Sequence, residues 1–197
     1  AQLLAITAVK EMLGEGPDYR RTEFVGPKVG SELIEAGIWA VCMSLLAIMI
    51  YIWFRFEWQF GIGAVVALMH DVITTIGLFA ILQLEFNLST IAAILTIAGY
   101  SINDTVVVYD RVRENLRKFK KMALPDLLNQ SINQTLARTT MTSVTTLLAL
   151  LALYFFGGEV IHDFVFAMIW GVFVGTYSSI FVAAPLLVKL KLRRDSG

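Results

Sequence analysis

The sequence is poor in charged residues and almost lacks cysteine. Charged residues make up 16% of its 197 positions, well below the quarter that is usual in proteins. A single cysteine, Cys42, excludes an internal disulfide framework, and because it lies in an apolar run we expect it to pack as a small hydrophobe. The 16 basic and 16 acidic residues cancel, so the net charge predicts no nucleic-acid partner. With 57% apolar residues, the composition is that of a membrane protein.

The motifs of soluble enzymes are also missing from the sequence. It contains no Walker A loop, no HExxH pair and no cluster of cysteines, so neither nucleotide hydrolysis nor a bound metal is predicted. We therefore expect a protein without catalytic residues, metal or cofactor, whose function resides in its membrane segments.

Five apolar stretches are long enough to cross a hydrocarbon layer about 30 Å thick, which needs roughly 20 helical residues. Unbroken runs of Ala, Ile, Leu and Val favour helices over the alternating strands of a membrane barrel. The expected fold is therefore an all-α polytopic membrane protein. Its predicted spans are residues 36–54, 58–84, 86–109, 139–158 and 164–188.

Basic residues are concentrated at one end of these spans. Arg55, the loop 110–138 and the tail 189–197 carry 12 of the 16 Lys and Arg residues (1, 7 and 4). The connections at the opposite end carry none. By the positive-inside rule the basic segments face the cytoplasm, and five spans then place residues 1–35 outside.

Residues 1–35 differ in character from the spans. Ala1–Leu13 has helical spacing, Thr22–Val25 is strand-like, and Val29–Glu35 leads into the first span. We interpret this segment as the C-terminal end of a periplasmic α+β domain with a lead-in helix. It has no features of a signal peptide, so we expect a further transmembrane helix to precede it.

Residues 110–138 form the longest predicted cytoplasmic segment, a helical loop. Asp110–Lys121 can continue the third span as a helix, and Pro125 then opens a second helix. Two interpretations stay open: the helices dock a partner or the lipid surface, or their basic residues simply keep the loop inside. The second helix carries apolar residues broadly along one side, namely Leu127, Leu128, Ile132 and Leu136.

Two carboxylic acids lie inside the predicted spans. An ionisable group there costs from about 2.5 kcal/mol upward at the bilayer centre, and it usually marks pairing or function. Asp71, next to His70, falls near mid-membrane, and Asp104 lies five residues from the inner end of its span. Tyr100 and Ser101 share the helix face of Asp104 at i−4 and i−3.

Arg138 begins the fourth span at a depth similar to that of Asp104, so the two can form a pair. The arginine favours the charged carboxylate and burial favours the neutral one, so a shift that separates them would let Asp104 bind a proton. A static ion pair is the alternative. The polar path predicted around this pair comprises His70, Asp71, Tyr100, Ser101, Asn103, Thr142 and Thr145.

The fifth span contains a G-x-x-x-G pattern at Gly171 and Gly175. Two glycines at this spacing let another helix approach closely. We therefore predict a helix-packing role for both residues.

Several motifs, in order along almost the whole chain, resemble the SecD/SecF family of protein-export membrane proteins in the resistance-nodulation-division (RND) superfamily. The most specific is GYSIND at 99–104, which has the form of the SecF branch rather than that of SecD. The other matching stretches are EFVGP at 23–27, FRFE at 54–57, HD at 70–71, DRVREN at 110–115, QTLART at 134–139 and FGG at 156–158.

The resemblance implies a six-helix RND-type module of which the five spans are helices two to six. It implies a protein of the bacterial cytoplasmic (inner) membrane that pairs with SecD. Its expected partners are the Sec translocon channel, the preprotein and the lipid bilayer, and its expected role is to assist late steps of export with the proton gradient. The proton-pathway aspartate of the family falls on Asp104 and its partner arginine on Arg138. No enzyme activity is implied.

Two other functions stay open. An efflux transporter of the same superfamily would export small molecules, although such chains are usually far longer and carry adjacent aspartates where Asn103 and Asp104 stand. A structural subunit would scaffold SecD and the translocon without conducting protons.

Overall fold

The structure is a computed structural model that describes residues 8–9, 11–12, 27–84 and 87–190. The chain divides into two units, residues 1–36 and residues 37–197. In the first unit, residues 8–9 and 11–12 are helical. The strand predicted at Thr22–Val25 lies outside the described residues. The part of the chain that is described contains helices and no strand.

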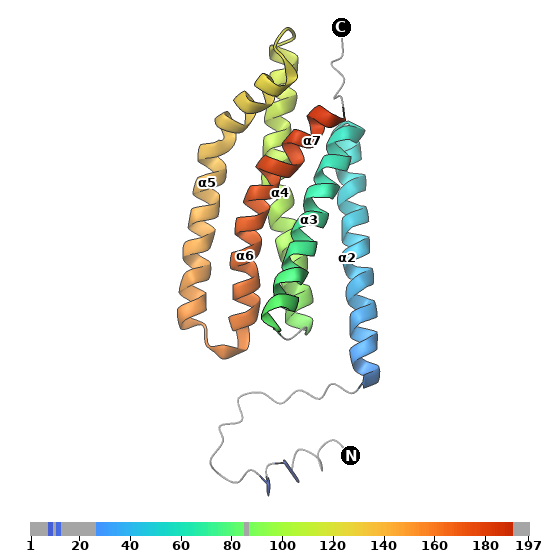
Figure 1. Cartoon of the computed structure of the whole chain (residues 1–197), viewed down its shortest axis with the longest axis vertical. Coiled ribbons are helices and arrows are strands. Elements are labelled where there is room, and N and C mark those ends of the chain that lie inside the picture. The colour runs from blue at the N-terminus through green and yellow to red at the C-terminus, as the bar shows by residue number, and fades with distance from the viewer. Residues whose placement is uncertain (1–7, 10, 13–26, 85–86, 191–197) are drawn as a thin grey trace. The chain divides into compact units, whose positions relative to one another are not determined.

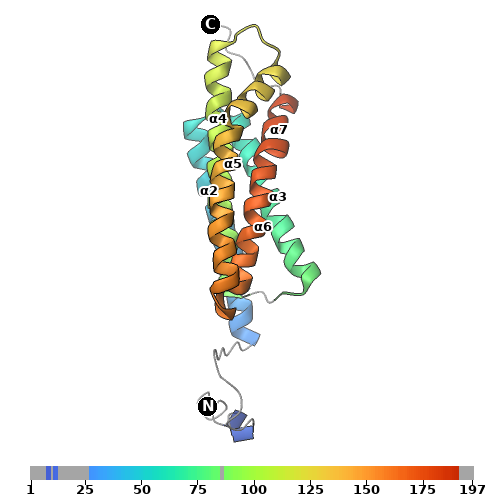
Figure 2. The same cartoon turned by 90° about the vertical axis from the view of Figure 1, so that its left-hand side faces the viewer.

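Long helices make up nearly all of the described chain, and the described residues of the second unit form a bundle (Figures 1 and 2). Five helical segments are long and apolar enough to cross a membrane. This confirms the predicted all-α membrane fold with five transmembrane helices. The helices are α2 (Pro27–Arg55), α3 (Trp58–Leu82), α4 (Leu88–Lys118), α5 (Leu124–Phe156), α6 (His162–Ser178) and α7 (Ala184–Lys189), with the short η1 (Glu159–Ile161) and η2 (Ser179–Ala183).

The connection between α3 and α4 is longer than predicted, because both helices are shorter at this end. Gln83 adopts a left-handed conformation with φ of 53°, which ends α3 at Leu82 rather than at residue 84. Asn87 then caps α4: its Oδ1 accepts the Thr90 N–H at 3.2 Å, and the Thr90 Oγ1 accepts the Asn87 N–H at 3.3 Å. This capping box starts α4 at Leu88 rather than at residue 86.

α4 and α5 both extend beyond the predicted spans. α4 continues to Lys118, short of the helix predicted over Asp110–Lys121. α5 joins the predicted helix at Pro125 and the fourth span into one helix of 33 residues, because no Gly or Pro interrupts it between Pro125 and Gly157. In Figures 1 and 2 the α4–α5 connection accordingly stands beyond the ends of α3 and α7.

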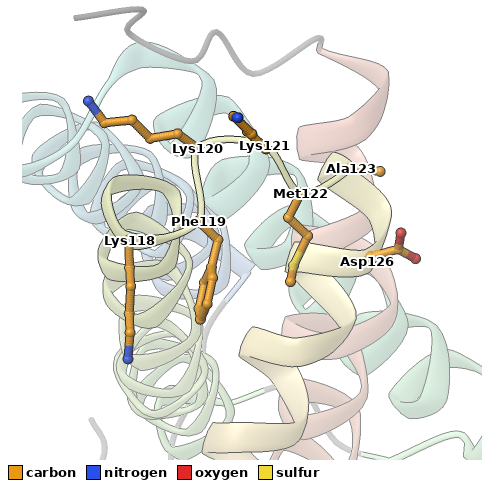
Figure 3. Close-up of a pocket in the computed structure, with 7 residues that line it drawn as sticks. All are labelled: Lys118, Phe119, Lys120, Lys121, Met122, Ala123 and Asp126. Carbon is orange, nitrogen blue, oxygen red and sulfur yellow. The ribbon is translucent and has the colours of Figure 1, made fainter.

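Side chains at the α4–α5 connection divide by polarity. Figure 3 shows Phe119 and Met122 directed into the space beside the two helices, while Lys120 and Lys121 project outward. Phe119 and Met122 are partly buried and pack against the core. The connection is therefore anchored by apolar contacts, and its lysines remain on the surface.

The last span is not one regular helix. Between α6 and α7 the five residues of η2 form a π-helical turn. Pro185 lies just beyond it, and a proline inside a helix removes one N–H and clashes with the carbonyl four residues earlier, which forces a local widening. The carbonyl of Ala183, at the end of η2, accepts a hydrogen bond from the Tyr109 hydroxyl of α4 at 3.2 Å.

The core of the bundle consists of two apolar clusters. The first lies toward the α4–α5 end: Ile52, Phe56, Phe60, Ala64, Ala67, Val108, Tyr109, Val112, Leu127, Leu128, Ala183, Ala184 and Leu187. The second lies toward the other end: Phe79, Ala93, Ile97, Leu150, Val165, Ala167, Met168 and Val172. On α3, α4, α5 and α6–η2, buried polar residues fall between the two clusters along the sequence.

Many apolar side chains point outward, as expected for helices surrounded by lipid. Cys42 is among the exposed residues of α2, so the prediction that it packs as a small hydrophobe is wrong. Its apolar neighbours Trp39, Met43 and Leu46 are exposed too. An apolar run therefore predicts that Cys42 lies in a span, but it does not predict that the side chain is buried in the core.

Candidate functional site

A layer of buried polar side chains separates the two apolar clusters. We call it the polar layer, and it draws residues from α3, α4, α5, α6 and η2. Its members are Asp71, Thr75, Ser101, Asp104, Thr105, Thr139, Ser143, Ser178 and Ser179. Polar groups inside a membrane bundle are costly unless they are paired or functional, so this layer is the candidate site.

Asp71 is the most completely enclosed carboxyl of the layer, with no exposed surface. Its Oδ2 accepts hydrogen bonds from Ser101 Oγ on α4 at 2.5 Å and from Ser178 Oγ on α6 at 2.8 Å. Its Oδ1 lies 3.1 Å from Nδ1 of His70, the preceding residue on α3. One carboxyl thus ties three helices together, and we call this group the Asp71 centre.

His70 connects the Asp71 centre to the surface of the chain. Its side chain is 34% exposed, and its ring lies 6.1 Å from that of Tyr177. Both residues line a cavity of about 360 Å³ with Thr74, Trp170, Phe173 and Val174. The titratable side chain in contact with Asp71 is therefore a histidine that is partly exposed on the outside of the bundle.

Asp104 lies one helical turn beyond Ser101 on α4 and is only 3% exposed. Its Oδ2 is buried, and no donor in the described chain reaches it. No ion pair shorter than 4 Å joins it to Arg138 among the described residues, although the Arg138 guanidinium is near enough to act on it electrostatically. The structure therefore places the two predicted partners near one another without closing the pair.

Hydroxyl pairs complete the layer on the other sides of α6 and η2. Thr105 Oγ1 of α4 and Ser179 Oγ of η2 are 2.9 Å apart. Ser143 Oγ of α5 and Thr176 Oγ1 of α6 are 2.8 Å apart. These contacts hold the last span against α4 and α5 at the level of the two carboxyls.

The α5 residues that the sequence analysis assigned to the polar path do not face the interior of this chain. Arg138 and Thr145 are exposed and Thr142 is half-buried. The Thr142 hydroxyl donates to the Arg138 carbonyl at 3.1 Å, and the Thr145 hydroxyl donates to the Met141 carbonyl at 2.9 Å. The buried face of α5 instead carries Thr139 and Ser143, and Thr139 Oγ1 has no partner in the described chain.

Two further residues of the predicted polar path, Tyr100 and Asn103, make no side-chain hydrogen bond in the described chain. The Tyr100 hydroxyl is buried, with no hydrogen-bond partner among the described residues. Asn103 is exposed. Neither makes a hydrogen bond to Asp104, so their predicted part in a polar path stays a prediction.

Gly171 and Gly175 lie where α6 crosses α4. A Cβ on Gly171 would collide with the Ile97 side chain, and a Cβ on Gly175 would lie 3.0 Å from Ser101 Cβ. The close approach at Gly175 is what brings α6 to the helix face that holds Ser101. The two glycines therefore set the distance at which Ser101 and Ser178 can share one carboxylate oxygen.

The polar layer holds residues that the sequence analysis missed, notably Thr105, Thr139, Ser143, Ser178 and Ser179. One signal was available on α5, where hydroxyl residues recur every four positions at Ser131, Thr135, Thr139 and Ser143, a spacing that marks one helix face. Ser178 and Ser179 carry no comparable signal. In the described part of the chain no group of three or more His, Cys, Asp or Glu residues could hold a metal.

The fold and the polar layer define a polytopic helical membrane protein with carboxyl groups buried between its spans. A family model described as "Protein export membrane protein SecD/SecF, C-terminal" matches residues 5–193. The chain belongs to this family of SecD/SecF protein-export membrane proteins.

Two relatives named protein translocase subunit SecF illustrate the similarity. The relative from Rhodobacter capsulatus is 60% identical over 173 residues, which are 88% of this chain and 52% of the relative. The relative from Rickettsia akari is 57% identical over 177 residues, which are 90% of this chain and 58% of the relative. The chain therefore spans little more than half the length of these relatives.

Solved structures agree with this assignment. SecDF from Thermus thermophilus, a translocon-associated membrane protein, superposes with a TM-score of 0.81 at 51% identity, over 86% of this chain and 24% of that one. SecDF in its super-membrane-facing form gives a TM-score of 0.78 at 48% identity, over 87% and 23%.

Proposed function

We propose that this chain is the C-terminal membrane part of a SecF-type subunit that assists preprotein export, pairs with SecD and draws on the proton gradient across the bacterial cytoplasmic membrane. In this proposal it is a transport accessory subunit rather than an enzyme. Its partners are SecD, the translocon channel and the preprotein. Residues 1–35 belong to a periplasmic domain, the loop 110–138 and the tail 189–197 face the cytoplasm, and the C-terminus lies inside.

The observation that carries the proposal is the environment of Asp104. Its carboxyl is buried in the polar layer, yet Oδ2 accepts no hydrogen bond from the described chain. A buried carboxyl that no donor fixes as a carboxylate can change protonation without breaking a contact. Moving one charge through the membrane potential yields about 2.3 kcal/mol per 100 mV, which is enough to bias a two-state protein.

Arg138 is the counter-charge in this mechanism. It acts on Asp104 electrostatically without forming an ion pair within 4 Å in the described chain. We propose that Arg138 approaches Asp104 in one conformation, where it favours the carboxylate, and withdraws in another, where the acid binds a proton. Because Arg138 is exposed on this chain, a small tilt of α5 is sufficient to change the separation.

The test is the rate of proton-gradient-dependent completion of preprotein export by the full-length protein assembled with SecD. Asp104→Asn should reduce this rate to the level measured without a gradient, because an amide cannot exchange the proton. Asp126→Asn is the matched control, since it makes the same chemical change at an exposed position at the start of α5. Its rate should equal that of the wild type.

Arg138 variants separate charge from hydrogen-bond geometry. Arg138→Lys keeps the positive charge and should retain part of the gradient dependence, whereas Arg138→Gln should lose it. Wild-type rates in Asp104→Asn, with normal recovery of the SecD complex, would contradict the coupling role.

A scaffold function is the second candidate, and the Asp71 centre favours it. This centre joins α3, α4 and α6 through one carboxylate oxygen, which is what a rigid subunit needs. A pure scaffold predicts that Asp104→Asn lowers recovery of the complex and leaves proton flux in vesicles unchanged. Flux that falls while recovery stays normal would exclude it.

A further inference from the structure

A basic cavity lies where α2 ends beside the extension of α4. It has a volume of about 450 Å³, and its lining residues are Arg55, Asp110, Arg113, Glu114, Arg117 and Lys118. The five residues from α4 are spaced i, i+3, i+4, i+7 and i+8, so they form one face of that helix. Nothing in the mechanism proposed for Asp104 uses this cavity.

The two acidic residues of the cavity are already neutralised. Asp110 Oδ1 pairs with Arg55 Nη2 at 3.0 Å. Glu114 Oε2 pairs at 2.8 Å with Nη1 of Arg111, which is not part of the lining. Arg113, Arg117 and Lys118 have no acidic partner within 4 Å among the described residues, so the cavity presents three unneutralised cations.

Arg113 is held in place before any ligand arrives. Its Nη1 donates to the Arg55 carbonyl at 3.1 Å, and its guanidinium lies 5.9 Å from the centre of the buried Phe56 ring. A fixed guanidinium loses less conformational entropy on binding, and its planar fork matches the oxygens of a phosphate group.

The cavity lies at the expected level of lipid headgroups. Arg55 directly follows the apolar run of the first span, and Asp110 is the first charge after the apolar part of α4. Trp53 and Trp58 are 66% and 53% exposed on either side of Arg55, and exposed tryptophans mark the boundary between hydrocarbon and water. Phe54 is 90% exposed beside them, so an apolar surface lies next to the cations.

We propose that this cavity binds the phosphate of an anionic phospholipid, with its acyl chains against the exposed residues at the end of α2. Phosphate chemistry follows from the arginines, and basic pockets at the cytoplasmic ends of transmembrane helices bind such headgroups. A zwitterionic headgroup is disfavoured because its ammonium group would meet the same cations. The cavity at Lys118–Asp126 is not the site, because its apolar members pack against the core and Lys120 and Lys121 point outward (Figure 3).

The test measures lipid affinity by native mass spectrometry on the full-length protein purified with its bound subunits. Phosphatidylglycerol should bind more tightly than phosphatidylcholine. Each cation near the surface contributes about fivefold in affinity, so Arg113→Gln with Arg117→Gln should weaken phosphatidylglycerol binding about 25-fold and leave phosphatidylcholine unchanged. Arg117→Gln alone should weaken phosphatidylglycerol binding about fivefold. This single variant keeps the hydrogen bond from Arg113 to the Arg55 carbonyl, so its effect does not depend on that contact.

The matched control removes two cations from other exposed positions at the same predicted face, with Lys121→Gln and Lys189→Gln. It should change the affinity by less than twofold. An equal loss in the control would overturn the proposal, since binding would then follow general charge. Displacement of the lipid by an equal concentration of inorganic phosphate would overturn it in favour of a free-anion site. Unchanged affinity in a folded Arg117→Gln variant would also contradict it.

Discussion

Asp71 and Asp104 are carboxyl groups in the same buried layer, but their surroundings are opposite. Asp71 accepts hydrogen bonds from two serines on two other helices and lies against His70. Asp104 has a buried oxygen that receives no hydrogen bond from the described chain. Burial alone therefore does not define the role of an intramembrane acid, because the donors around it decide whether it is fixed or free.

The contrast indicates a division of labour. A carboxyl with several donors resists a change of protonation, because each change breaks or reverses a hydrogen bond. A carboxyl without donors is poorly stabilised in either state and responds to the approach of a single charge. We therefore expect Asp71 to determine stability and Asp104 to determine coupling, and variants can test each half separately.

The largest effect on stability is expected at Asp71. Asp71→Ala removes two interhelical hydrogen bonds, worth about 0.6 to 1.7 kcal/mol each in membrane proteins, and leaves a cavity. The free energy of unfolding, measured by denaturant titration in mixed micelles, should fall by roughly 2 to 4 kcal/mol. Asp104→Ala creates a similar cavity without losing a hydrogen bond and should cost less than half as much. Equal losses in the free energy of unfolding for the two variants would show that Asp71 and Asp104 do not differ in their contribution to stability.

The next effect is expected at Gly175, which controls the distance between α6 and the Asp71 centre. Its added Cβ in Gly175→Ala would lie 3.0 Å from Ser101 Cβ and 3.3 Å from Ser101 Oγ, and such overpacking costs about 1 to 3 kcal/mol. Gly99→Ala is the control, since nothing lies within 4 Å of its added Cβ, and it should be neutral or stabilising. Ser101→Gly removes both of these Ser101 atoms, so the loss caused by Gly175→Ala should be smaller in a Ser101→Gly background. A loss of the same size in that background would show that the strain does not arise at Ser101.

Smaller effects are expected from the two serines. Ser101→Ala and Ser178→Ala each remove one donor to Asp71 Oδ2 and should each lower the free energy of unfolding by about 0.6 kcal/mol, at most about 1.7. Thr96→Val is the control on α4, because that exposed hydroxyl bonds only to its own helix in the described chain. If Thr96→Val lowers the free energy of unfolding as much as Ser101→Ala does, the hydrogen bonds to Asp71 add no stability of their own.

The sequence predicted the helices better than it predicted the site. Length and apolarity suffice to identify five spans, because a bilayer demands both. Asp71 and Asp104 could be selected because a charge in an apolar run is rare. The buried face of α5 was assigned wrongly, because Thr142 and Thr145 are as polar as Thr139 and Ser143. Only the four-residue spacing of hydroxyl residues from Ser131 to Ser143 indicated which side is buried. The donors of Asp71 could not be predicted, because Ser178 is 107 residues away in sequence and only the fold brings them together.

The smallest effect on stability is expected at Asp104. A small effect there would separate a role in coupling from a role in holding the fold. Asp104→Asn keeps the shape of the side chain and breaks no hydrogen bond found in the described chain, so the free energy of unfolding should change by no more than about 0.5 kcal/mol. The same variant should abolish gradient-dependent export. Measured together on one preparation, an unchanged stability and a lost gradient response would assign Asp104 to coupling alone. A stability loss as large as that of Asp71→Ala would instead make Asp104 a second structural acid and remove the contrast.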